Sequence, residues 1–579
     1  MRVKASHSLL LGLSMSALML AMQARAEEAF TLKAASPLLD HSPTQTIPLR
    51  AAPDKLAPLQ LEPSPLLEAP EPALPSTLGA PAATAPAPVA DPLAIAAALK
   101  QGFEDLAKEP TRNIAAKRER EAVAAFYAAR DFAPLWIEKT GWTSAAKAAL
   151  SRLEHADEDG LSLKLALPTL GGASDGERAA TELALSMAIV TYGRQASGSR
   201  IDPQAIDKLI TEKPEVAEPA HILSTLAAAV DADAALRSFN PSHSAYLALR
   251  EKLAEVRREK PRGDAPVASG PTLKVGMKDP RVPVIRARFG LDPQPIAQNG
   301  EGLLYDTRVA SAVADFQRSH GLPANGQLTA RTVLALSGGD PARLEAEIIA
   351  NMERWRWRAR GEAPERIEVN IPDFSVRLMR DNAEFYRARV IVGKTTTRTP
   401  VFSNRMQFIE VNPYWNVPDS IIRKEMMPKL AEDPTYLERM GYQVSTSAGG
   451  RMSVRQPPGA KNALGNIKFM FPNQHAVYLH DTPNRNLFAN EMRAYSHGCV
   501  RLDKPFKFAE VVLGPENGWT EERARSLVGG KNQTIHLPHP IDIHIGYYTA
   551  FVDGEGKLQV RDDIYGYSRK VRVALGLEA

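Results

Sequence analysis

One cysteine, Cys499, occurs in the 579 residues of the chain, and it lies within a run of residue types that nucleophilic catalysis uses. The run reads Ser496-His497-Gly498-Cys499-Val500-Arg501, and His480 precedes it along the chain. A cysteine attacks a carbonyl carbon as its thiolate, and an imidazole within reach can take the thiol proton. The pattern therefore predicts Cys499 as the nucleophile and His480 as the general acid and base.

The residues around Cys499 fit the same chemistry. Gly498 removes a side chain beside the nucleophile, so backbone N–H groups there can hold a developing oxyanion. Arg501 adds positive potential that favours the thiolate, and Ser496 and His497 are expected to orient the loop or to donate further hydrogen bonds.

Three other interpretations concern the same residues. Cys499 could be an inert buried thiol, and His480 could be a structural histidine. His480, His497 and Cys499 are also ligand types that zinc accepts, but the sequence supplies no fourth partner at a matching spacing. We therefore predict a thiol catalyst with no metal and no cofactor.

Two short strands have to bring these groups together. Successive side chains of a strand point to opposite faces. In 476–480, Tyr478 and His480 therefore share one face, and in the second strand Cys499 and Arg501 share the face opposite Val500. If the two strands pair, the imidazole and the thiol can lie on the same exposed face.

The composition excludes several classes of protein. Charged residues make up 24% and hydrophobic residues 44%, with a formal net charge of +4, as in an ordinary soluble globular protein. A disulfide scaffold and a Cys-rich zinc module are excluded by the single cysteine, and a membrane bundle by the lack of long apolar runs. The weak basic bias suits an acidic polymer surface and falls short of a nucleic-acid-binding protein.

The beginning of the chain reads as a secretory signal peptide over residues 1–26. Arg2 and Lys4 precede an apolar stretch, and Ala24-Arg25-Ala26 has the form of a cleavage site. An uncleaved membrane anchor is the alternative, although the apolar stretch is short. We expect an exported, periplasmic protein without a stable membrane span after cleavage, in which an unpaired thiol indicates a reactive site.

The rest of the chain divides by composition and periodicity. Proline and alanine dominate 27–100, which predicts a disordered tether. Helical spacing comes next, with a separate set of short helices after it, and then strand-like alternation. We expect a helical scaffold domain at 101–260, a small helical module at 271–340, a mainly β catalytic domain at 345–550 with a mobile flap inserted at about 418–466, and a tail at 551–579 that packs on the scaffold or the catalytic domain.

Two resemblances carry the functional interpretation further. The segment from Ala312 to Leu322, with Gly326 and Thr332, resembles the three-helix peptidoglycan-binding module of bacterial wall enzymes, with Asn325 in place of the usual aspartate. The run from Ser496 to Arg501, preceded by His480, resembles the signature of the L,D-transpeptidases. Further matches are Ile391-Val392-Gly393, Thr399-Pro400, Asn412-Pro413, Leu464-Gly465 and Phe471-Pro472-Asn473. The fold class implied is a multidomain α+β protein of the large periplasmic type of this family.

That resemblance implies a thioester mechanism in peptidoglycan biosynthesis and the maintenance of cell shape. Cys499 attacks the carbonyl of the third residue of a tetrapeptide stem, a meso-diaminopimelate, and D-alanine leaves. The side-chain amine of a second stem then forms a 3→3 cross-link, and carbapenems are expected to acylate Cys499. Stem peptides are thus the expected partners. The residues expected to line the substrate groove are Trp415, Asn416, Tyr478 and Tyr495.

Two alternative functions remain, one enzymatic with the same catalytic residues and one non-catalytic. Water or another amine could resolve the thioester, which describes an L,D-carboxypeptidase, an enzyme that attaches or detaches a wall-linked protein, or a D-amino-acid exchanger. A non-catalytic peptidoglycan-binding protein with a degenerate enzyme domain is the third hypothesis, and the presence of Cys499, His480, Gly498 and Arg501 argues against it.

Overall fold

The computed structural model of the protein describes residues 91–108, 114–170, 174–258, 267–268, 270–292, 301–319, 322–336, 341–450 and 452–578. The predicted signal peptide (1–26) and the predicted tether as far as residue 90 lie outside these residues. No helix in the described part of the chain is both long enough and apolar enough to cross a membrane.

The helical region begins earlier than the boundary predicted at residue 101. Helix α2 spans Pro92–Lys108, so its N-terminal half lies in the range that composition assigned to the tether. Its residues Ile95, Leu99 and Phe103 recur every fourth position and are buried, so they form an apolar stripe that packs against the other helices. The predicted tether therefore does not reach residue 100, because residues 92–100 are helical.

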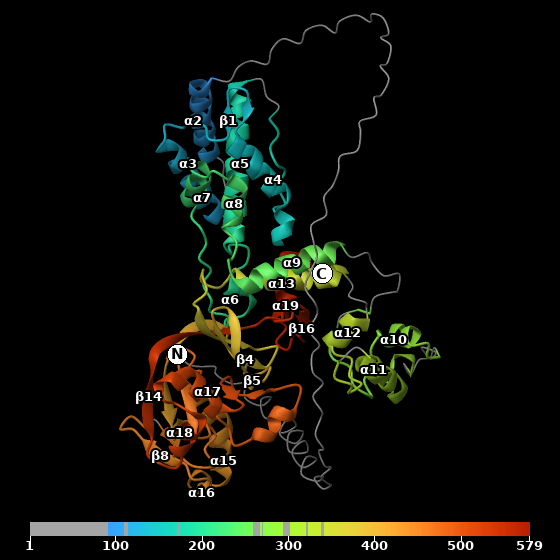
Figure 1. Cartoon of the computed structure of the whole chain (residues 1–579), viewed down its shortest axis with the longest axis vertical. Coiled ribbons are helices and arrows are strands. Elements are labelled where there is room, and N and C mark those ends of the chain that lie inside the picture. Colours follow the sequence, from blue (N-terminus) through green and yellow to red (C-terminus); the bar gives the residue numbers. More distant parts are fainter. Residues whose placement is uncertain are drawn as a thin grey trace, which may run out of the picture. The chain divides into compact units, whose positions relative to one another are not determined.

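The scaffold is a bundle of α-helices around its own hydrophobic core (Figure 1). The long helix α5 (Asp175–Ala196) begins with a capping box, in which the Ser174 side chain and the Glu177 side chain each bond the other's backbone N–H. The other helical and strand elements of this region are α3 (Ile114–Ala128), β1 (Ile137–Glu138), β2 (Gly141–Trp142), α4 (Ser144–Glu154), η1 (Ala156–Asp159), α6 (Pro203–Ile206), α7 (Pro219–Ala227) and α8 (Ala232–Arg237).

Two further helices connect the scaffold with the C-terminal half of the chain. Helix α9 (Ser244–Arg258) packs against α13 (Pro341–Trp355), and their buried side chains form a separate cluster that includes Leu249 and Ile348. Because α9 precedes the small module in the chain and α13 comes after it, the module is inserted between two helices that contact each other.

The described residues of the small module form three helices, as its resemblance to the three-helix module implies: α10 (Val282–Arg288), α11 (Thr307–Ser319) and α12 (Ala330–Leu336), with the 3₁₀ turn η2 (Glu301–Leu303). Asp306 caps α11 by accepting a hydrogen bond from Val309 N–H at 2.9 Å. Thr329 caps α12 in the same way, through Thr332 N–H at 3.2 Å.

The catalytic region is built on one sheet whose strand order is β12-β5-β13-β11-β10-β6-β14-β3-β4. Strand β4 also pairs with β5, so the sheet closes on itself and β12 is attached beside β5. The strands are β3 (Glu365–Asn370), β4 (Ser375–Arg380), β5 (Ala383–Gly393), β6 (Phe402–Val411), β10 (Ile467–Met470), β11 (Leu479–His480), β12 (Ala494–Ser496), β13 (Val500–Leu502) and β14 (Gln533–Gly546).

The interior of this closed sheet is the largest hydrophobic core of the described chain. Alternate strand residues such as Val390, Ile409, Phe469 and Leu479 are fully buried in it, and Phe508 from a helix packs against them. The helical elements of this region are η4 (Arg485–Ala489), α17 (Pro505–Leu513), η5 (Pro515–Asn517) and α18 (Glu521–Ser526). The fold class predicted from the sequence, multidomain α+β with a mainly β catalytic domain, is confirmed.

The predicted flap is an insertion between β6 and β10, which are neighbours in the sheet. It has its own three-stranded sheet and a small core that includes Ile422, Leu437 and Val454. The insertion already begins at Trp415, because the first strand of that small sheet pairs with its last. Its elements are β7 (Trp415–Asn416), α14 (Asp419–Ile421), the π-helix η3 (Ile422–Met426), α15 (Met427–Glu432), α16 (Tyr436–Arg439), β8 (Gln443–Thr446) and β9 (Met452–Gln456).

The C-terminal segment packs on both the catalytic sheet and the helices before it. It comprises β15 (Ala550–Val552), β16 (Leu558–Val560) and α19 (Tyr567–Leu575). Tyr565, Tyr567 and Val571 belong to the core of the closed sheet, whereas Val552 and Leu558 pack against the cluster formed by α9 and α13.

Candidate active site

A parallel strand pair brings the predicted nucleophile and base to one face of the sheet. Strands β11 and β13 run parallel, with Leu479 opposite Val500 and His480 opposite Arg501. Side chains of paired residues share a face, and side chains alternate along each strand. Tyr478, His480, Cys499 and Arg501 therefore lie on one face, while Leu479 and Val500 are fully buried on the other.

His480 lies in a row of charged side chains that crosses four strands. Lys468 on β10 is paired with His480 on one side and with Glu410 of β6 on the other, while Arg501 of β13 completes the row. The Lys468 ammonium forms an ion pair with Glu410 at 2.8 Å. The imidazole thus has a cation on each side. Sequence reasoning missed Lys468 and Glu410, because the strand alternation of 467–470 shows a face but not which strand it pairs with.

The hydrogen bonding of His480 fixes which ring nitrogen can act as a base. Its Nδ1 lies 2.5 Å from the backbone carbonyl oxygen of Asp481, and a carbonyl can only accept, so Nδ1 carries the proton. The neutral ring therefore leaves Nε2 unprotonated. Burial first, and then the positive charges of Arg501 and Lys468, lower the pKa of His480 to about 3, against the backbone carbonyls of Asp481 and Leu464, which raise it. At neutral pH the imidazole can accept a proton.

Cys499 is partly exposed and carries no disulfide. Burial raises the pKa of its thiol to about 11, although hydrogen bonds with Tyr478 and the positive charges of Arg501 and Lys468 lower it. The thiol is thus protonated at neutral pH, on the same face as an unprotonated imidazole. Such a pair needs proton transfer to accompany attack by the sulfur rather than to precede it.

The loop before Cys499 is held by its own serine. The Ser496 hydroxyl donates to the backbone carbonyl of Cys499 at 2.5 Å and accepts from Gly498 N–H at 3.1 Å. Gly498 has φ +120°, a conformation that a residue with a side chain rarely adopts. In this conformation the Gly498 N–H predicted for the oxyanion hole is engaged within the loop by Ser496.

A second turn supports this loop from outside. Lys394 N–H and the Thr397 hydroxyl both donate to the Ser496 carbonyl, each at 3.0 Å, and the Thr399 hydroxyl donates to the Gly498 carbonyl at 2.9 Å. The turn can approach so closely because Gly393 precedes it: a Cβ there would lie 2.1 Å from the Thr397 carbonyl oxygen.

Tyr565 of the C-terminal segment connects this turn to the hydrophobic core through two hydrogen bonds. Its hydroxyl donates to the Gly393 carbonyl at 2.6 Å and accepts from Thr399 N–H at 3.2 Å. Tyr565 is 5% exposed and belongs to the hydrophobic core. Sequence reasoning did not single out Tyr565, because no local pattern indicates which distant turn a tail residue reaches.

We expect Tyr565→Phe to lower kcat by about tenfold and to leave KM nearly unchanged, since about 1.4 kcal/mol corresponds to a tenfold change in rate. The physical reason is that the variant keeps the ring in the core but loses both hydrogen bonds to the 393–399 turn. Steady-state kinetics on a tetrapeptide substrate measure this. Tyr386→Phe, whose hydroxyl makes only a 3.5 Å contact with the Lys504 carbonyl, is the matched control. Equal kcat in the two variants would contradict the positioning role.

His497 connects the catalytic loop to the inserted flap. Its Nε2 lies 2.8 Å from the carboxylate of Glu425, which is part of the π-helix η3. Both side chains are partly or largely exposed. The side chain of His497 thus contacts the flap, whereas the neighbouring Ser496 side chain is turned into the loop.

The residues predicted to bind substrate lie in three different places. Tyr478 contacts the thiol, since its side chain hydrogen bonds with Cys499. Trp415 and Asn416 form β7 of the flap, where the Trp415 ring packs 6.4 Å from the Tyr442 ring and Asn416 is exposed. Tyr495, next to Ser496 on β12, lines a separate cavity. Of the four, the structure brings only Tyr478 to the nucleophile.

The described residues contain no group of three or more His, Cys, Asp or Glu side chains placed to hold a metal ion. The site offers a thiol, an unprotonated imidazole nitrogen and a guanidinium on one face, and the carbonyl groups of Ser496 and Gly498 in the loop before the thiol are held from outside. These groups can transfer an acyl group through the sulfur.

Comparisons with protein families match three parts of the chain. The model for the L,D-transpeptidase catalytic domain matches residues 364–529, the model for the scaffold domain matches 121–253, and the model described as "Putative peptidoglycan binding domain" matches 287–336. The scaffold match extends into α9, whereas the other two matches fall within the catalytic region and the small module.

Among curated proteins, a Haemophilus influenzae protein named "Putative L,D-transpeptidase" is 34% identical over 281 residues. The match covers 45% of this chain and 56% of that protein, so the chain spans about half the length of the relative.

The chain is also similar to solved structures of L,D-transpeptidases, at low identity. An L,D-transpeptidase from Mycobacterium smegmatis is 14% identical, with 32% of this chain and 60% of that one covered and a TM-score of 0.17. An L,D-transpeptidase from Xylanimonas cellulosilytica is 12% identical, with 48% and 99% covered and a TM-score of 0.15.

The catalytic family therefore rests on the sequence matches, and the geometry around Cys499 lies inside the matched range. Residues 364–529 are an L,D-transpeptidase catalytic domain, which this chain combines with a scaffold domain and a peptidoglycan-binding domain.

Proposed function

We propose that the protein is a peptidoglycan L,D-transpeptidase that forms 3→3 cross-links between stem peptides through a thioester on Cys499. The observation that supports this most is the common face of Cys499 and His480, with the Nδ1 proton of His480 directed to the Asp481 carbonyl, so that Nε2 is the nitrogen that can accept the thiol proton. The peptidoglycan-binding domain in the same chain supports the wall polymer as the substrate.

The first half-reaction forms the acyl-enzyme. The Cys499 sulfur attacks the carbonyl carbon of the third residue of a tetrapeptide stem as its proton moves to His480 Nε2. The bond between that carbonyl carbon and the nitrogen of D-alanine then breaks, and His480 returns the proton to the leaving amine. A thioester on Cys499 and free D-alanine result.

In the second half-reaction His480 again accepts and returns a proton, this time from the acceptor amine to the Cys499 sulfur. The side-chain amine of a meso-diaminopimelate on another stem attacks the thioester carbonyl, and His480 takes a proton from that amine. The carbon–sulfur bond breaks and the proton returns to the Cys499 sulfur. The product is a 3→3 peptide bond, and the enzyme is regenerated without a cofactor.

The row of charges around His480 suits this sequence. Proton transfer creates an imidazolium and a thiolate next to each other, and Arg501 lies on the same face as the forming anion. Burial raises the energy of each isolated charge, but the two charges form together and attract each other strongly at low dielectric.

The experiment that tests the proposal monitors the products of one purified substrate. The protein is incubated with a disaccharide tetrapeptide, and D-alanine and muropeptides are measured by mass spectrometry. We expect D-alanine release together with a 3→3 dimer. D-alanine with only tripeptide would make the protein an L,D-carboxypeptidase, and exchange of added D-amino acids would make it an exchanger. No D-alanine release at all would overturn the enzymatic proposal.

The site of action proposed is outside the cytoplasm, where the polymer lies, and export by the N-terminal segment is part of this proposal. Removal of the signal is checked by N-terminal sequencing of the mature protein, which is expected to begin near Glu27.

A further inference from the structure

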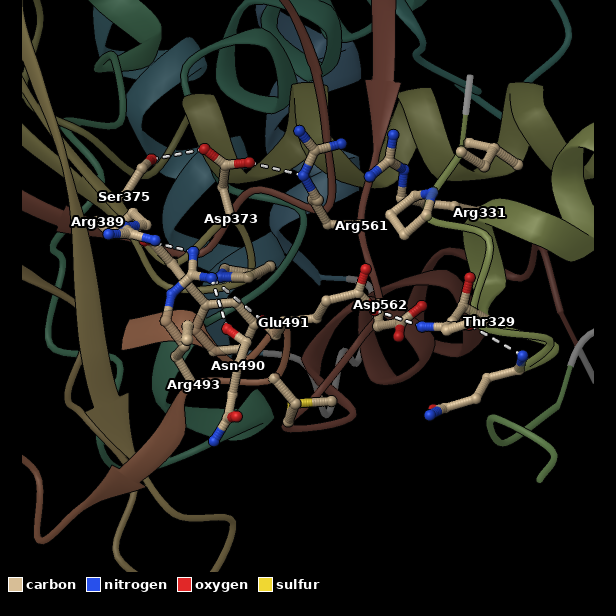
Figure 2. Close-up of a pocket in the computed structure, with 18 of the residues that line it drawn as sticks. Thr329, Arg331, Asp373, Ser375, Arg389, Asn490, Glu491, Arg493, Arg561 and Asp562 are labelled. Atoms are coloured by element: carbon tan, nitrogen blue, oxygen red, sulfur yellow. Dashed lines mark hydrogen bonds and ion pairs between the residues drawn. The ribbon is translucent and has the colours of Figure 1, made fainter. Parts of the chain in front are cut away.

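A cavity of about 1380 Å³ lies between the peptidoglycan-binding module and the catalytic sheet, apart from the catalytic residues (Figure 2). On one side it is lined by the module's segment 322–332. On the other side it is lined by 372–375, by 489–495 and by Arg561 and Asp562. Neither Cys499 nor His480 lines it, so it is a separate site.

Three hydrogen bonds join the two sides of the cavity. The Asn325 side chain donates to the Glu491 carboxylate at 2.6 Å. Asp562 accepts from Ala330 N–H at 2.9 Å, at the beginning of α12, and from the Thr272 hydroxyl at 3.5 Å. Burial raises the pKa of the Asp562 carboxyl. Residues of both domains therefore form one continuous surface.

Positive charge dominates this surface. Seven lysine or arginine residues and four aspartate or glutamate residues line the cavity, which leaves three positive charges in excess. Most of the carboxylates are already engaged: Asp373 pairs with Arg387 and Arg561, each at 2.6 Å, and Asp503 pairs with Arg389 at 2.8 Å.

Arg331 at the beginning of α12 is the notable cation. Within the described part of the chain, its guanidinium has neither an ion pair nor a hydrogen bond, and the same holds for the ammonium groups of Lys274 and Lys504. Figure 2 shows the guanidinium of Arg331 near that of Arg561. Burial lowers the pKa of Arg331, and the like charge of Arg561 lowers it further. A partly buried cation beside another cation is stabilised by a bound anion.

The cavity also has a direct connection to the catalytic loop. Tyr495 lines the cavity, and the next residue, Ser496, holds the carbonyl of Cys499. Because successive strand residues point to opposite faces, β12 has the cavity on one side and the nucleophile loop on the other.

We propose that this cavity binds a carboxylate-bearing segment of a peptidoglycan strand, with Arg331 as the principal anion ligand and Lys274 and Lys504 as supporting cations. The inference rests on the proposed function for the identity of the polymer. A guanidinium can bind a carboxylate with two parallel hydrogen bonds, and stem peptides carry free carboxylates. The volume exceeds the ~300–1,000 Å³ of small-molecule pockets, which favours a segment of a polymer over a single amino acid.

Binding is tested in the full chain with Cys499→Ala, so that no substrate is consumed. The probe is a soluble disaccharide tetrapeptide oligomer, measured by isothermal titration calorimetry. We expect Arg331→Gln to weaken binding at least about tenfold and Lys274→Gln about threefold, because each removes a cation that faces the cavity. Arg308→Gln is the matched control: Arg308 is an exposed arginine of α11 outside the cavity, and its substitution is expected to change affinity less than about twofold.

Chemical modification of the probe separates charge from shape. Amidation of its carboxylates is expected to weaken binding to the parent protein at least as much as Arg331→Gln does, and to weaken binding to Arg331→Gln less than it weakens binding to the parent. Equal affinity of parent, Arg331→Gln and Lys274→Gln would overturn the proposal. Lys274→Gln is measured as well, because it still tests the proposal if the melting curve shows that the Arg331→Gln protein is unfolded.

The result is distinguishable from failure of the proposed function. If Arg331→Gln binds weakly while the unmodified protein makes no 3→3 dimer, the cavity assignment stands and the function falls. If the protein cross-links stems and Arg331→Gln binds as the parent does, only the cavity assignment falls.

Discussion

Cys499→Ala is expected to lower D-alanine release from a tetrapeptide stem by at least ~10⁴-fold, because the variant lacks the atom that forms the thioester. It is also expected to show no covalent mass increment with a carbapenem, since the chain has no other cysteine. Release of D-alanine and the mass of the intact protein measure the two effects.

Cys499 is partly exposed, so its truncation is expected to leave the fold intact, with a melting temperature within about 3 °C of the parent. Cys499→Ser is the companion variant: it keeps a side chain of similar shape, but its hydroxyl is a far weaker nucleophile in this site. Substantial D-alanine release by either variant, from a protein that melts as the parent does, would contradict the role of the thiol.

His480→Ala is expected to lower kcat/KM by about 100- to 10,000-fold, because it removes the group that accepts the thiol proton and returns it to the leaving amine. His539→Ala is the matched control: His539 is an exposed histidine of β14 that pairs with Glu365, and its loss is expected to leave kcat/KM unchanged. Steady-state kinetics measure both variants, and similar values for both would contradict the assignment of the base.

The pH dependence of the parent tests the same residue without a substitution. The pKa of His480 is lowered to about 3 and that of Cys499 is raised to about 11. Lowering of the imidazole pKa keeps the base unprotonated as pH falls, and raising of the thiol pKa keeps the proton in place as pH rises. Hence kcat/KM is expected to vary less than about twofold between about pH 5.5 and 8.5. A decrease in kcat/KM at pH values below about 6.5, the ordinary pKa of histidine, would contradict the buried neutral imidazole.

Local periodicity explains why the sequence alone predicts much of the site. Alternation alone shows that Tyr478 and His480 share a face and that Cys499 and Arg501 share one, because the direction of a side chain in a strand depends on the backbone next to it. In the same way, the change from helical to strand-like spacing indicated the beginning of the catalytic domain.

Contacts between residues that are distant in sequence could not be predicted in this way. Lys468 lies beside His480 because of the strand order, Tyr565 reaches Gly393 because the C-terminal segment joins the core, and Glu425 reaches His497 because the flap folds back toward the loop. Which elements meet is decided by the packing of whole faces, to which each residue contributes only a part.

The structure differs from two predictions, one made from composition and one from resemblance. The proline-rich stretch was assigned to residue 100, yet the apolar spacing of Ile95 and Leu99 starts a helix at Pro92. Tyr495, expected in the substrate groove, lines the cavity on the other side of β12. In both cases one or two residues near a boundary decide the outcome, and the average character of the segment does not show it.

The most direct measurement of the central claim is to trap the acyl group on the protein. The enzyme is mixed with a tetrapeptide donor that lacks an acceptor amine, quenched in acid within the first turnover, and analysed as intact protein and as peptides by mass spectrometry. We predict a mass increment equal to the donor without D-alanine, on the peptide that contains Cys499, removable by hydroxylamine. Accumulating product without any such adduct, or an adduct on another residue, would contradict the account.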